Sequence, residues 1–487
     1  MLTTYEQTDL ARKKQAHYDH VEAHYDRFAE ERHKWQERNG YFYERDLKAL
    51  KSLIPEGARI LEIGSGNGDV LANLNPSYGV GIDVSARMVE VARAAHPHLS
   101  FTRANIEETS DLEAIEGPFD YILMSDLVGL LFDVQETLEK LHRLMDPHTR
   151  LVISYHNRWW EPFFHLLVRL GWAMPRPLQN WFALSELVNL IVLEDYDVIQ
   201  RQSRELSPFR LLGIGSLINR VIAPLPVINA LCWRSHIVAR SRRSAEERNP
   251  SVTVLIPCRN EKGNIEPSVL RTPEMGPRTE ILFVEGHSRD GTYEECLRVK
   301  DAYPERDVRV LQQTGKGKGD AVRLGFHEAA GDVVMIVDSD LTVPPEYMPR
   351  VYNALASGEA EFVNCTRLVY PMEKGAMRPL NYVANRGFAK ILSYLLNQSL
   401  SDTLCGTKAL YRNDYLTIEA ERGRMGSLDP FGDFDLIFGA ARHNLCIVEI
   451  PVRYDARGYG ETQIARFADG WQLLKLVIRA FLHFKAQ

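Results

Sequence analysis

VVMIVDSDLTVPP, residues 333–345, decides how the rest of this chain is interpreted. Five apolar residues, most of them β-branched, lead into Asp338, Ser339 and Asp340, and two prolines close the segment. An apolar run of this length predicts a strand buried in a parallel sheet. Because open α/β sheets bind ligands beyond the carboxyl ends of their strands, we expect both carboxylates at a binding edge. Two carboxylates at this spacing suit a divalent cation that also binds substrate phosphates, although a solvated turn at the strand end is the alternative.

The length and composition describe an ordinary multi-domain protein. A chain of 487 residues is too long for one core, so we expect two or three domains. The net charge of −7 gives no reason to expect nucleic-acid binding. Six cysteines are scattered without a CxxC pair, which indicates reduced thiols in a cytoplasmic protein. The sequence starts without the apolar core of a signal peptide, and no apolar run reaches the ~18 residues of a membrane-spanning helix.

Two alternations of strand and helix patterns divide the chain. Residues 5–50 are polar with an apolar helical stripe and predict a helical lid ahead of the first sheet. Strand-like runs alternate with helical runs over residues 58–156 and again from residue 251, which predicts an α/β fold of two doubly wound domains on parallel sheets. We expect residues 157–235 to cover the first sheet. The predicted bounds are 1–238 for the first domain, 239–250 for a charged linker and 251–487 for the second domain.

A glycine-rich loop follows the first strand of the first domain. It has the pattern Glu62-x-Gly64-x-Gly66-x-Gly68, and Asp83 ends the next strand. Glycines at a strand-to-helix turn let a ligand approach the backbone closely, and a strand-end carboxylate can accept hydrogen bonds from ribose hydroxyls. Loop and acid in this order predict a nucleoside-containing cofactor. The alternating glycines differ from the GxGxxG of nicotinamide-binding proteins, but a nicotinamide oxidoreductase is the alternative for this half.

The same stretch resembles the class I S-adenosylmethionine-dependent methyltransferases over residues 40–160. EIGSGNG (62–68) is similar to their first motif and GIDVSARM (81–88) to their second. The resemblance implies that the loop wraps the methionine moiety, that Asp83 holds the ribose and that Asn105 contacts the adenine. It also implies that Ser125 and Asp126 face the methyl donor and acceptor. The implied cofactor-binding residues are Glu62, Gly64, Gly66, Gly68, Asp83, Asn105 and Ser125.

Methyl transfer requires mainly alignment, because the sulfonium is already a good leaving group. A base is needed only if the acceptor must lose a proton. His156 lies at a predicted strand end and is a candidate, although a lone histidine is more often structural.

The second domain resembles the inverting family 2 glycosyltransferases, and especially the dolichol- or polyprenyl-phosphate sugar synthases. The likeness covers residues 250–465 in five ordered motifs, from VTVLIPCRNEKGNI (252–265) to IPVRYDARGYGETQI (450–464). It implies a GT-A-type fold that binds a nucleotide-sugar. The implied donor-binding residues are Pro257, Arg259, Glu261, Glu285, Asp290, Lys316, Lys318 and Asp338. The sequence departs from the family pattern at Glu285-Gly286, which replaces an aspartate pair, at Thr407, which replaces an aromatic residue, and at Gln463, which replaces a lysine.

The expected reaction places negative charge on a nucleotide-diphosphate leaving group. The resemblance implies that Mg²⁺ or Mn²⁺ on Asp338 and Asp340, with Arg457 and lysines nearby, stabilises that charge. A polyprenyl phosphate acceptor is already anionic and needs no general base. A hydroxyl acceptor requires a carboxylate, for which Asp433 and Asp435 are the candidates, although either is also a common residue at a helix start.

Three segments combine apolar and basic residues. The last segment, 470–487, places Lys475, Arg479 and His483 at intervals of four beside an apolar face. Such a helix lies in a membrane interface or docks its apolar side on its own domain, and the same stripe serves both. Segments 208–233 and 374–400 have a similar composition. The expected location is therefore cytoplasmic, with peripheral contact at the cytoplasmic face of a membrane as one of two outcomes.

Together these features predict a bifunctional enzyme that transfers a methyl group from S-adenosylmethionine and a sugar from a nucleotide-sugar. That both activities serve one membrane-linked glycoconjugate is a hypothesis motivated by the fusion of the two domains. The remaining alternative is that one half is a non-catalytic binding or scaffold module.

Overall fold

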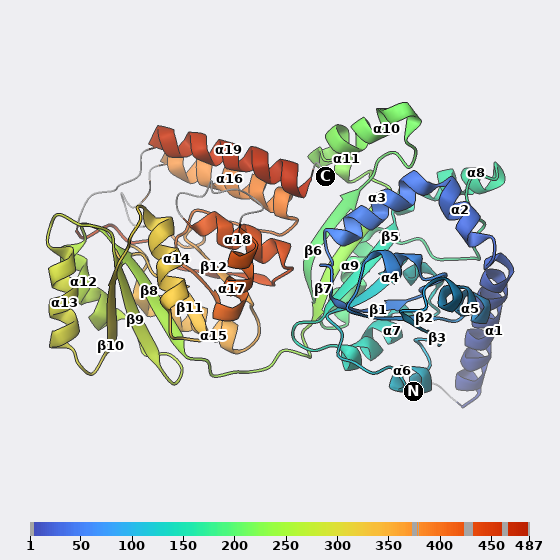
Figure 1. The fold of residues 1–487 in the computed structure, drawn as a ribbon, viewed down its shortest axis with the longest axis horizontal. Coiled ribbons are helices and arrows are strands. Elements are labelled where there is room, and N and C mark those ends of the chain that lie inside the picture. The colour runs from blue at the N-terminus through green and yellow to red at the C-terminus, as the bar shows by residue number, and fades with distance from the viewer. Residues whose placement is uncertain (1–3, 373–376, 378, 423–431, 460–465, 486–487) are drawn as a thin grey trace. The chain divides into compact units, whose positions relative to one another are not determined.

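The structure, a computed structural model, describes residues 4–372, 377, 379–422, 432–459 and 466–485. It consists of two compact units, Met1–Ser244 and Ala245–Gln487, and each is described by itself (Figure 1). Strand β7 (Arg234–Ser241) extends into the predicted linker 239–250. Its last residues pair with the neighbouring strand, and the side chain of Arg240 also forms an ion pair with Asp197 there. Three residues of that predicted linker are therefore strand.

The first unit is built on a seven-stranded mixed sheet with the strand order β3-β2-β1-β4-β5-β7-β6. Strands β1 to β5 pair in parallel, and β7 runs antiparallel to both of its neighbours. The other strands are β1 (Arg59–Ile63), β2 (Tyr78–Asp83), β3 (Ser100–Arg103), β4 (Tyr121–Ser125), β5 (Arg150–His156) and β6 (Tyr196–Arg204). The α-helices are α1 (Thr4–Phe28), α2 (Arg32–Arg38), α3 (Gly40–Lys51), α4 (Asp69–Asn73), α5 (Ala86–Ala95), α6 (Thr109–Glu113), α7 (Val134–Leu141), α8 (Glu161–Arg169), α9 (Leu184–Leu193), α10 (Ile214–Leu217) and α11 (Pro226–Asn229).

Two strands lie in a segment that the sequence predicted only as a cover. The expectation for residues 157–235 is incomplete, because they contain all of β6 and the start of β7. Every residue of β7 is buried, yet the strand contains Arg234, His236 and Arg240. Arg234 and His236 both pair with the buried carboxylate of Asp46 on α3. A strand with so many polar residues has neither an apolar run nor a clean alternation, so its pattern does not reveal it.

The second unit contains a seven-stranded sheet with the strand order β10-β9-β8-β11-β13-β12-β14. Its strands are β8 (Val252–Cys258), β9 (Thr279–Glu285), β10 (Asp307–Gln312), β11 (Val333–Ile336), β12 (Phe362–Thr366), β13 (Lys408–Tyr411) and β14 (Ile447–Pro451). The α-helices are α12 (Lys262–Arg271), α13 (Thr292–Ala302), α14 (Lys318–Glu328), α15 (Met348–Ala356), α16 (Pro379–Leu396), α17 (Arg412–Ala420), α18 (Asp433–Arg442) and α19 (Arg466–Phe484). The strand predicted from residues 333–337 is the central β11, and all four of its residues are buried.

The α/β fold of two doubly wound domains is confirmed, but neither sheet is purely parallel. In the second unit, β13 lies between β11 and β12 and is antiparallel to both. Its four residues follow the fully buried Thr407, where the sequence indicated only a departure from the glycosyltransferase pattern and no strand. The buried Lys408 interrupts the apolar pattern, so the sequence does not reveal this strand.

Glu62, predicted as a cofactor ligand, lies at the end of β1 and is 1% exposed. Its Oε2 accepts a hydrogen bond of 3.2 Å from the backbone N–H of Leu71 in α4. Burial raises the pKa of Glu62 to about 8. The carboxyl therefore ties the strand to the helix beyond the glycine loop.

We predict that replacing this group changes how the stability of the first unit depends on pH. The folded Glu62 keeps its proton up to about pH 8, whereas an unfolded glutamate loses it near its ordinary pKa of about 4.3. Between these values the folded state binds one proton more, so the free energy of unfolding falls by about 1.4 kcal/mol per pH unit. Glu62→Gln keeps an oxygen for the Leu71 N–H and removes this contribution. Urea unfolding across that pH range measures the difference in slope.

The matched control is Glu56→Gln, which replaces an exposed glutamate of the same unit. Parallel stability profiles for the wild type and Glu62→Gln would contradict the protonated state of Glu62.

Candidate functional site

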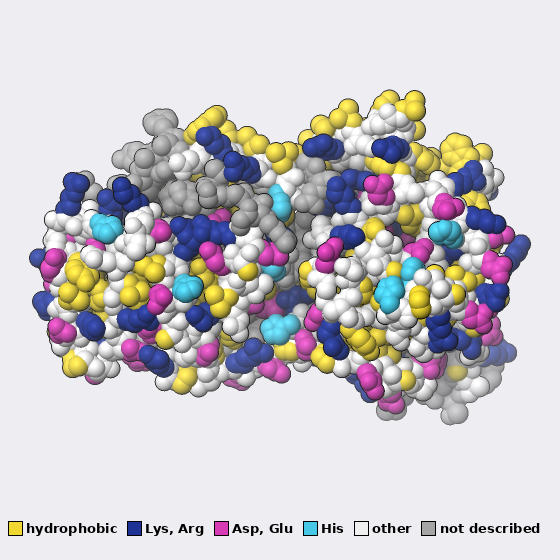
Figure 2. All heavy atoms as spheres, viewed as in Figure 1, with side chains coloured by type: hydrophobic (Ala, Val, Ile, Leu, Met, Phe, Trp, Pro, Cys, Tyr) yellow, Lys and Arg dark blue, Asp and Glu magenta, His cyan; other side chains and the backbone are white. Residues whose placement is uncertain are grey.

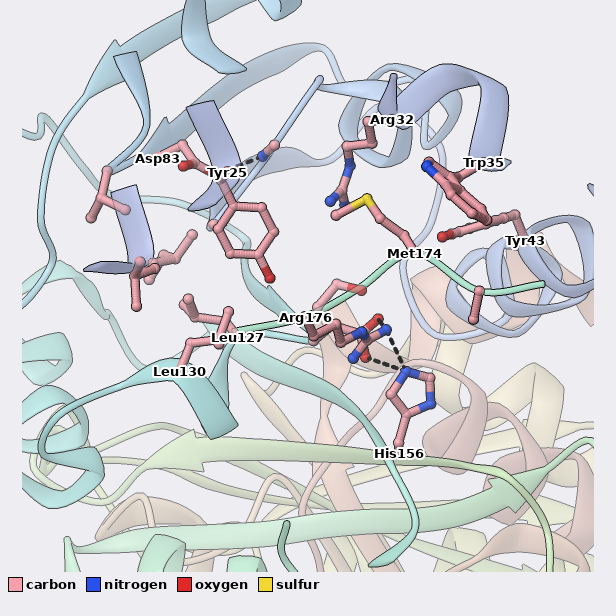
Figure 3. A pocket seen from close by; sticks show the side chains of 18 of the residues that line it. Tyr25, Arg32, Trp35, Tyr43, Asp83, Leu127, Leu130, His156, Met174 and Arg176 are labelled. Atoms are coloured by element: carbon pink, nitrogen blue, oxygen red, sulfur yellow. Dashed lines mark hydrogen bonds and ion pairs between the residues drawn. The ribbon is translucent and has the colours of Figure 1, made fainter. Parts of the chain in front are cut away.

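A cavity of about 150 Å³ opens at the carboxyl ends of β1, β2 and β4 in the first unit (Figure 3). Of the predicted cofactor ligands it is lined by Gly64, Gly66, Asp83, Asn105 and Ser125. Glu62 and Gly68 are not among its lining residues, so the structure brings together five of the seven.

Asp83 is held in place by the backbone of the glycine loop. Its Oδ2 accepts from the N–H of Gly66 at 2.8 Å, and its Oδ1 accepts from the N–H of Ser85 at 2.9 Å. Burial raises the pKa of Asp83, while these two hydrogen bonds lower it. Each oxygen keeps a further lone pair, so the carboxylate can still accept from a hydroxyl in the cavity.

The N-terminal helices supply cavity residues that sequence motifs did not identify. Tyr25 of α1, Arg32 and Trp35 of α2, and Tyr43 of α3 all line the cavity (Figure 3). Arg32 lies against the glycine loop, because a Cβ on Gly66 would be 3.1 Å from its Nε. That Nε is buried and has no hydrogen-bond partner in the protein. The helices predicted as a lid therefore bring a cation with an unused donor to the cofactor loop.

Asp126 was predicted to face the methyl donor and acceptor, but its carboxylate forms ion pairs with two arginines. Its Oδ1 accepts from the guanidinium of the fully buried Arg234, and its Oδ2 lies 3.3 Å from Arg176. Although burial opposes it, these cations hold the pKa of Asp126 well below its ordinary value. Asp126 is therefore a fixed anion and not a proton acceptor.

His156 is also unsuited to act as a base. Trp233 donates its Nε1–H to His156 Nδ1 at 2.6 Å, and His156 Nε2 lies 2.8 Å from Nη2 of Arg176 and 3.3 Å from Asp126, so both ring nitrogens are already occupied by neighbouring groups. Burial lowers the pKa of His156 to about 4. In the cavity of the first unit, the geometry thus favours alignment of reactants and not proton abstraction.

In the second unit, Asp338 forms an ion pair at the end of β11. Its Oδ1 lies 2.7 Å from Nζ of Lys318, the first residue of α14. Although burial alone acts in the opposite direction, Lys318 lowers the pKa of Asp338. A Cβ on Gly406 would come within 2.3 Å of Nζ and 2.4 Å of Asp338 Oδ2, so a side chain at this position would displace the ion pair. The structure therefore brings Lys318, the Asp-x-Asp pair and the segment around Gly406 together.

Arg457 joins the opening loop to the second carboxylate. It donates to Glu261 Oε1 at 2.7 Å and to Asp340 Oδ2 at 2.6 Å. Asp340 Oδ1 accepts from the backbone N–H and the hydroxyl of Thr342. Three of the residues that the sequence singled out thus meet, although they lie far apart in the chain.

The remaining predicted donor residues have different surroundings. Glu285 is fully buried and accepts from the Ser288 N–H and from Gln312. Asp290 accepts from the Thr292 hydroxyl and from the Lys262 N–H. Pro257 lies at the end of β8, the side chain of Arg259 packs on Gly286, and Lys316 is exposed.

The two acids at the start of α18 point in different directions. Asp433 lies 3.8 Å from Lys318 Nζ, beside the Asp338 pair, whereas Asp435 pairs with Arg422 at 3.1 Å. Residues two apart on a helix do not share a face, so only one can turn to the site. The structure thus brings Asp433 to the Asp-x-Asp pair and leaves Asp435 elsewhere.

Sequence motifs also missed a buried ion pair beneath this site. Arg367, after β12, lies 2.8 Å from the fully buried Asp402. Lys408 of β13 is fully buried as well, and its Nζ donates to the carbonyl of Cys405. The signal was present in the sequence, because a charged residue beside a buried strand requires a partner.

The carboxylates suit a divalent cation that is completed by its substrate. Within the residues that the structure describes, no group of three or more His, Cys, Asp or Glu side chains comes together as a metal site. Two carboxylates next to two cations instead match a cation bound by one or two carboxylates plus substrate phosphates. Gln463 lies outside the described residues.

Both halves match known protein families. Residues 253–417 match the model for glycosyl transferase family 2, and residues 32–200 match a methyltransferase domain. The chain is 27% identical over 234 residues to the low-salt glycan biosynthesis hexosyltransferase Agl6 of Haloferax volcanii, covering 47% of this chain and 53% of that protein. It is 37% identical over 109 residues to a dolichol-phosphate mannosyltransferase of Saccharomyces cerevisiae, covering 21% of this chain and 40% of that protein. The chain thus spans about half or less of the length of these two relatives.

A dolichyl-phosphate hexose transferase of Haloferax volcanii is 30% identical over 207 residues, which cover 42% of this chain and 82% of that protein. Among solved structures, a SAM-dependent methyltransferase from Thermotoga maritima, a possible histamine N-methyltransferase, matches with 18% identity and a TM-score of 0.34, covering 46% of this chain and 100% of that one. A glucosyl-3-phosphoglycerate synthase from Mycobacterium tuberculosis matches with 18% identity and a TM-score of 0.36, covering 48% and 80%. The sequence matches show that this chain belongs to glycosyl transferase family 2 through its second half and carries a methyltransferase domain in its first.

Proposed function

We propose that this chain is a bifunctional enzyme. Its first unit transfers a methyl group from S-adenosylmethionine, and its second unit transfers a sugar, with inversion, from a nucleotide-sugar to a polyprenyl phosphate or a related glycoconjugate. The observation that carries the proposal is the meeting of Lys318, Asp338, Asp340, Glu261 and Arg457 at one sheet edge, in a chain whose other sheet holds a glycine-lined cavity.

The first cavity offers groups that match the parts of S-adenosylmethionine. Asp83 is placed to accept from ribose hydroxyls, and Asn105 is a polar group for the adenine. Arg32 supplies a buried donor without a partner beside Gly66, which suits the carboxylate of the methionine moiety. When bound, the cofactor supplies an activated methyl group, and the walls of the cavity align the acceptor with it.

We predict that Arg32→Met weakens S-adenosylmethionine binding about 10- to 100-fold, because a charge-assisted hydrogen bond is lost. Lys34→Met, an exposed lysine on the same helix, is the matched control and leaves the affinity unchanged. Isothermal titration with S-adenosylmethionine and, separately, with NAD measures both outcomes. Equal affinity in the two variants removes Arg32 from the site, and binding of NAD in place of S-adenosylmethionine favours an oxidoreductase.

The second site is arranged to hold a diphosphate. Lys318 and Arg457 are cations with partly exposed side chains, and each is paired with a carboxylate of the Asp-x-Asp motif. Asp338 and Asp340 would hold Mg²⁺ or Mn²⁺, which would stabilise charge on the leaving group. A lipid phosphate acceptor needs no proton acceptor, whereas for a hydroxyl acceptor Asp433 is the nearer of the two candidate bases.

We predict that Asp338→Asn lowers sugar transfer on the order of 10²–10³-fold with Mn²⁺ present, because a carboxylate that holds the cation is lost. Asp435→Asn, whose carboxylate faces Arg422, keeps most of the activity and serves as the control. A screen of UDP-, GDP- and dTDP-sugars with a polyprenyl phosphate provides the assay. Equal transfer by Asp338→Asn and the wild type would remove Asp338 from the metal site, and no transfer by the wild type with any of these donors would support a scaffold role for this half.

Helix α19, which packs beside α16, suggests how the second unit contacts a lipid acceptor. Helix α19 buries Leu476 and Ala480 against the core beside α16 and exposes Trp471, Leu474 and Ile478. Lys475 and Arg479 are exposed on the same helix, so one side of the helix docks on its own domain and the other side carries the apolar and basic residues that membrane contact requires. None of the described helices has both the length and the hydropathy to cross a membrane. We propose that this face rests on the lipid surface that carries the acceptor.

We predict that replacing Leu474 and Ile478 together by Ser weakens binding of the full chain to anionic vesicles by at least about tenfold in a sedimentation assay. The reason is that two apolar side chains no longer insert into the lipid interface. The two positions are chosen because both side chains are exposed, whereas serine at a buried position such as Leu436 would disturb the core. Unchanged sedimentation would show that α19 does not contact lipid.

A further inference from the structure

An exposed apolar segment of the first unit is the basis of the inference. Residues 206–231, called the apolar platform here, connect β6 to β7 and include α10 and α11 (Figure 1). Its exposed apolar side chains are Leu211, Leu212, Ile214, Leu217, Val221, Ile222, Leu225, Val227 and Leu231. Leu212 is completely exposed and Val227 is 83% exposed. Figure 2 shows these apolar side chains gathered over α10. Soluble proteins rarely expose apolar patches of this extent unless the patch has a partner.

The platform is an ordered structure, because its polar groups are satisfied toward the protein. Asn219 is 4% exposed, and its Oδ1 accepts from the N–H groups of Leu206 and Ser207 at 2.8 Å each. Its Nδ2 donates to the Ser207 carbonyl and to the hydroxyl of Tyr41 on α3. Asn229 donates to the carbonyl of Ser203 on β6. The apolar side chains therefore face outward because the fold holds them there.

The tip of the platform has a backbone that apolar residues rarely adopt. Leu211 and Leu212 have φ angles of 46° and 54°, in the left-handed region. Gly215 packs so closely that a Cβ would lie 1.8 Å from the carbonyl oxygen of Phe209. This close packing fixes the turn that holds the side chain of Leu212 out in solvent.

The charge of the platform identifies the kind of surface that covers it. Arg210 and Arg220 are the only charged residues from Leu206 to Trp233, and both are exposed. An apolar surface rimmed by arginine and free of acids complements the anionic headgroups and acyl chains at a bilayer surface. We propose that the apolar platform docks the first unit on an anionic lipid surface.

The platform is continuous with the wall of the cofactor cavity. Its residues Pro208 and Phe209 line the cavity, together with Phe164 and Leu167 of α8. Trp172, which follows α8, packs edge-to-face on Phe209 and is 47% exposed. Tryptophan and arginine at the rim of an apolar face are typical of groups at the membrane–water interface. Docking would place the mouth of the cavity at the lipid surface, so the methyl acceptor would be an amphiphile in that surface. This last step depends on the proposed methyl transfer, whereas docking itself does not.

The test uses the full chain with an environment-sensitive dye at Leu212→Cys. All six native cysteines are buried, so the introduced thiol is the reactive one. The variants also carry Leu474→Ser and Ile478→Ser, which remove the apolar face of α19. The matched control carries the dye at Glu116→Cys, an exposed position after α6 in the same unit.

We expect dye emission at position 212 to shift to the blue with vesicles of phosphatidylcholine and phosphatidylglycerol, and far less with phosphatidylcholine alone. Adding Leu217→Ser and Val227→Ser should weaken vesicle binding at least about tenfold, while S-adenosylmethionine binding stays unchanged. Equal responses at 212 and 116 would overturn the proposal. A shift that follows protein concentration without vesicles would overturn it too, because it would show a second copy of the chain on the platform. Loss of S-adenosylmethionine binding with dye insertion retained would reject methyl transfer and leave docking standing.

Discussion

The first unit depends on one buried guanidinium. Arg234 is fully buried and contacts Asp46 on α3, Asp126 after β4 and Ser154 on β5. Although burial opposes it, Arg234 lowers the pKa of Asp46 to about 2, so the pair stays ionised. Removing one member of a buried pair leaves a charge without a counterion, which typically costs about 3–5 kcal/mol. The guanidinium thereby fixes the helices that cover the cavity to the strands that form its floor.

The second unit uses charge pairs with a different degree of burial. The side chains of Lys318 and Arg457 are 27% and 25% exposed, whereas that of Arg234 is 0% exposed. A partly exposed cation can be reached by a ligand, whereas a fully buried cation cannot. Arg234 is therefore a structural cation, and Lys318 and Arg457 are the cations that would contact a diphosphate in the proposed reaction. This difference separates a scaffold from a binding site more clearly than residue type does.

The sequence predicted the parts of each fold that follow from local pattern. Runs such as residues 333–337 identified the parallel strands, because a strand buried on both faces must be apolar throughout. The strands β6, β7 and β13 were missed. In β7 and β13 the reason is a buried cation, Arg234 or Lys408, which is stabilised by groups that only the fold brings to it. The pairing of Arg234 with Asp46 joins residues 188 positions apart, which no local pattern reports. Likewise, spacing could not choose between Asp433 and Asp435, because the choice depends on how α18 is rotated in the core.

Both units leave exposed apolar side chains beside basic ones, and this shared feature bears on why the two domains are joined. The platform exposes leucines near Arg210 and Arg220, and α19 exposes Trp471 and Leu474 near Lys475. Each surface alone is small, and weak interfacial contacts of this kind bind reversibly. When two weak contacts are tethered in one chain, the second binds at the high effective concentration that the tether sets, so the affinity of the whole exceeds that of either part. If both docking proposals hold, fusion of the two domains serves attachment as well as catalysis.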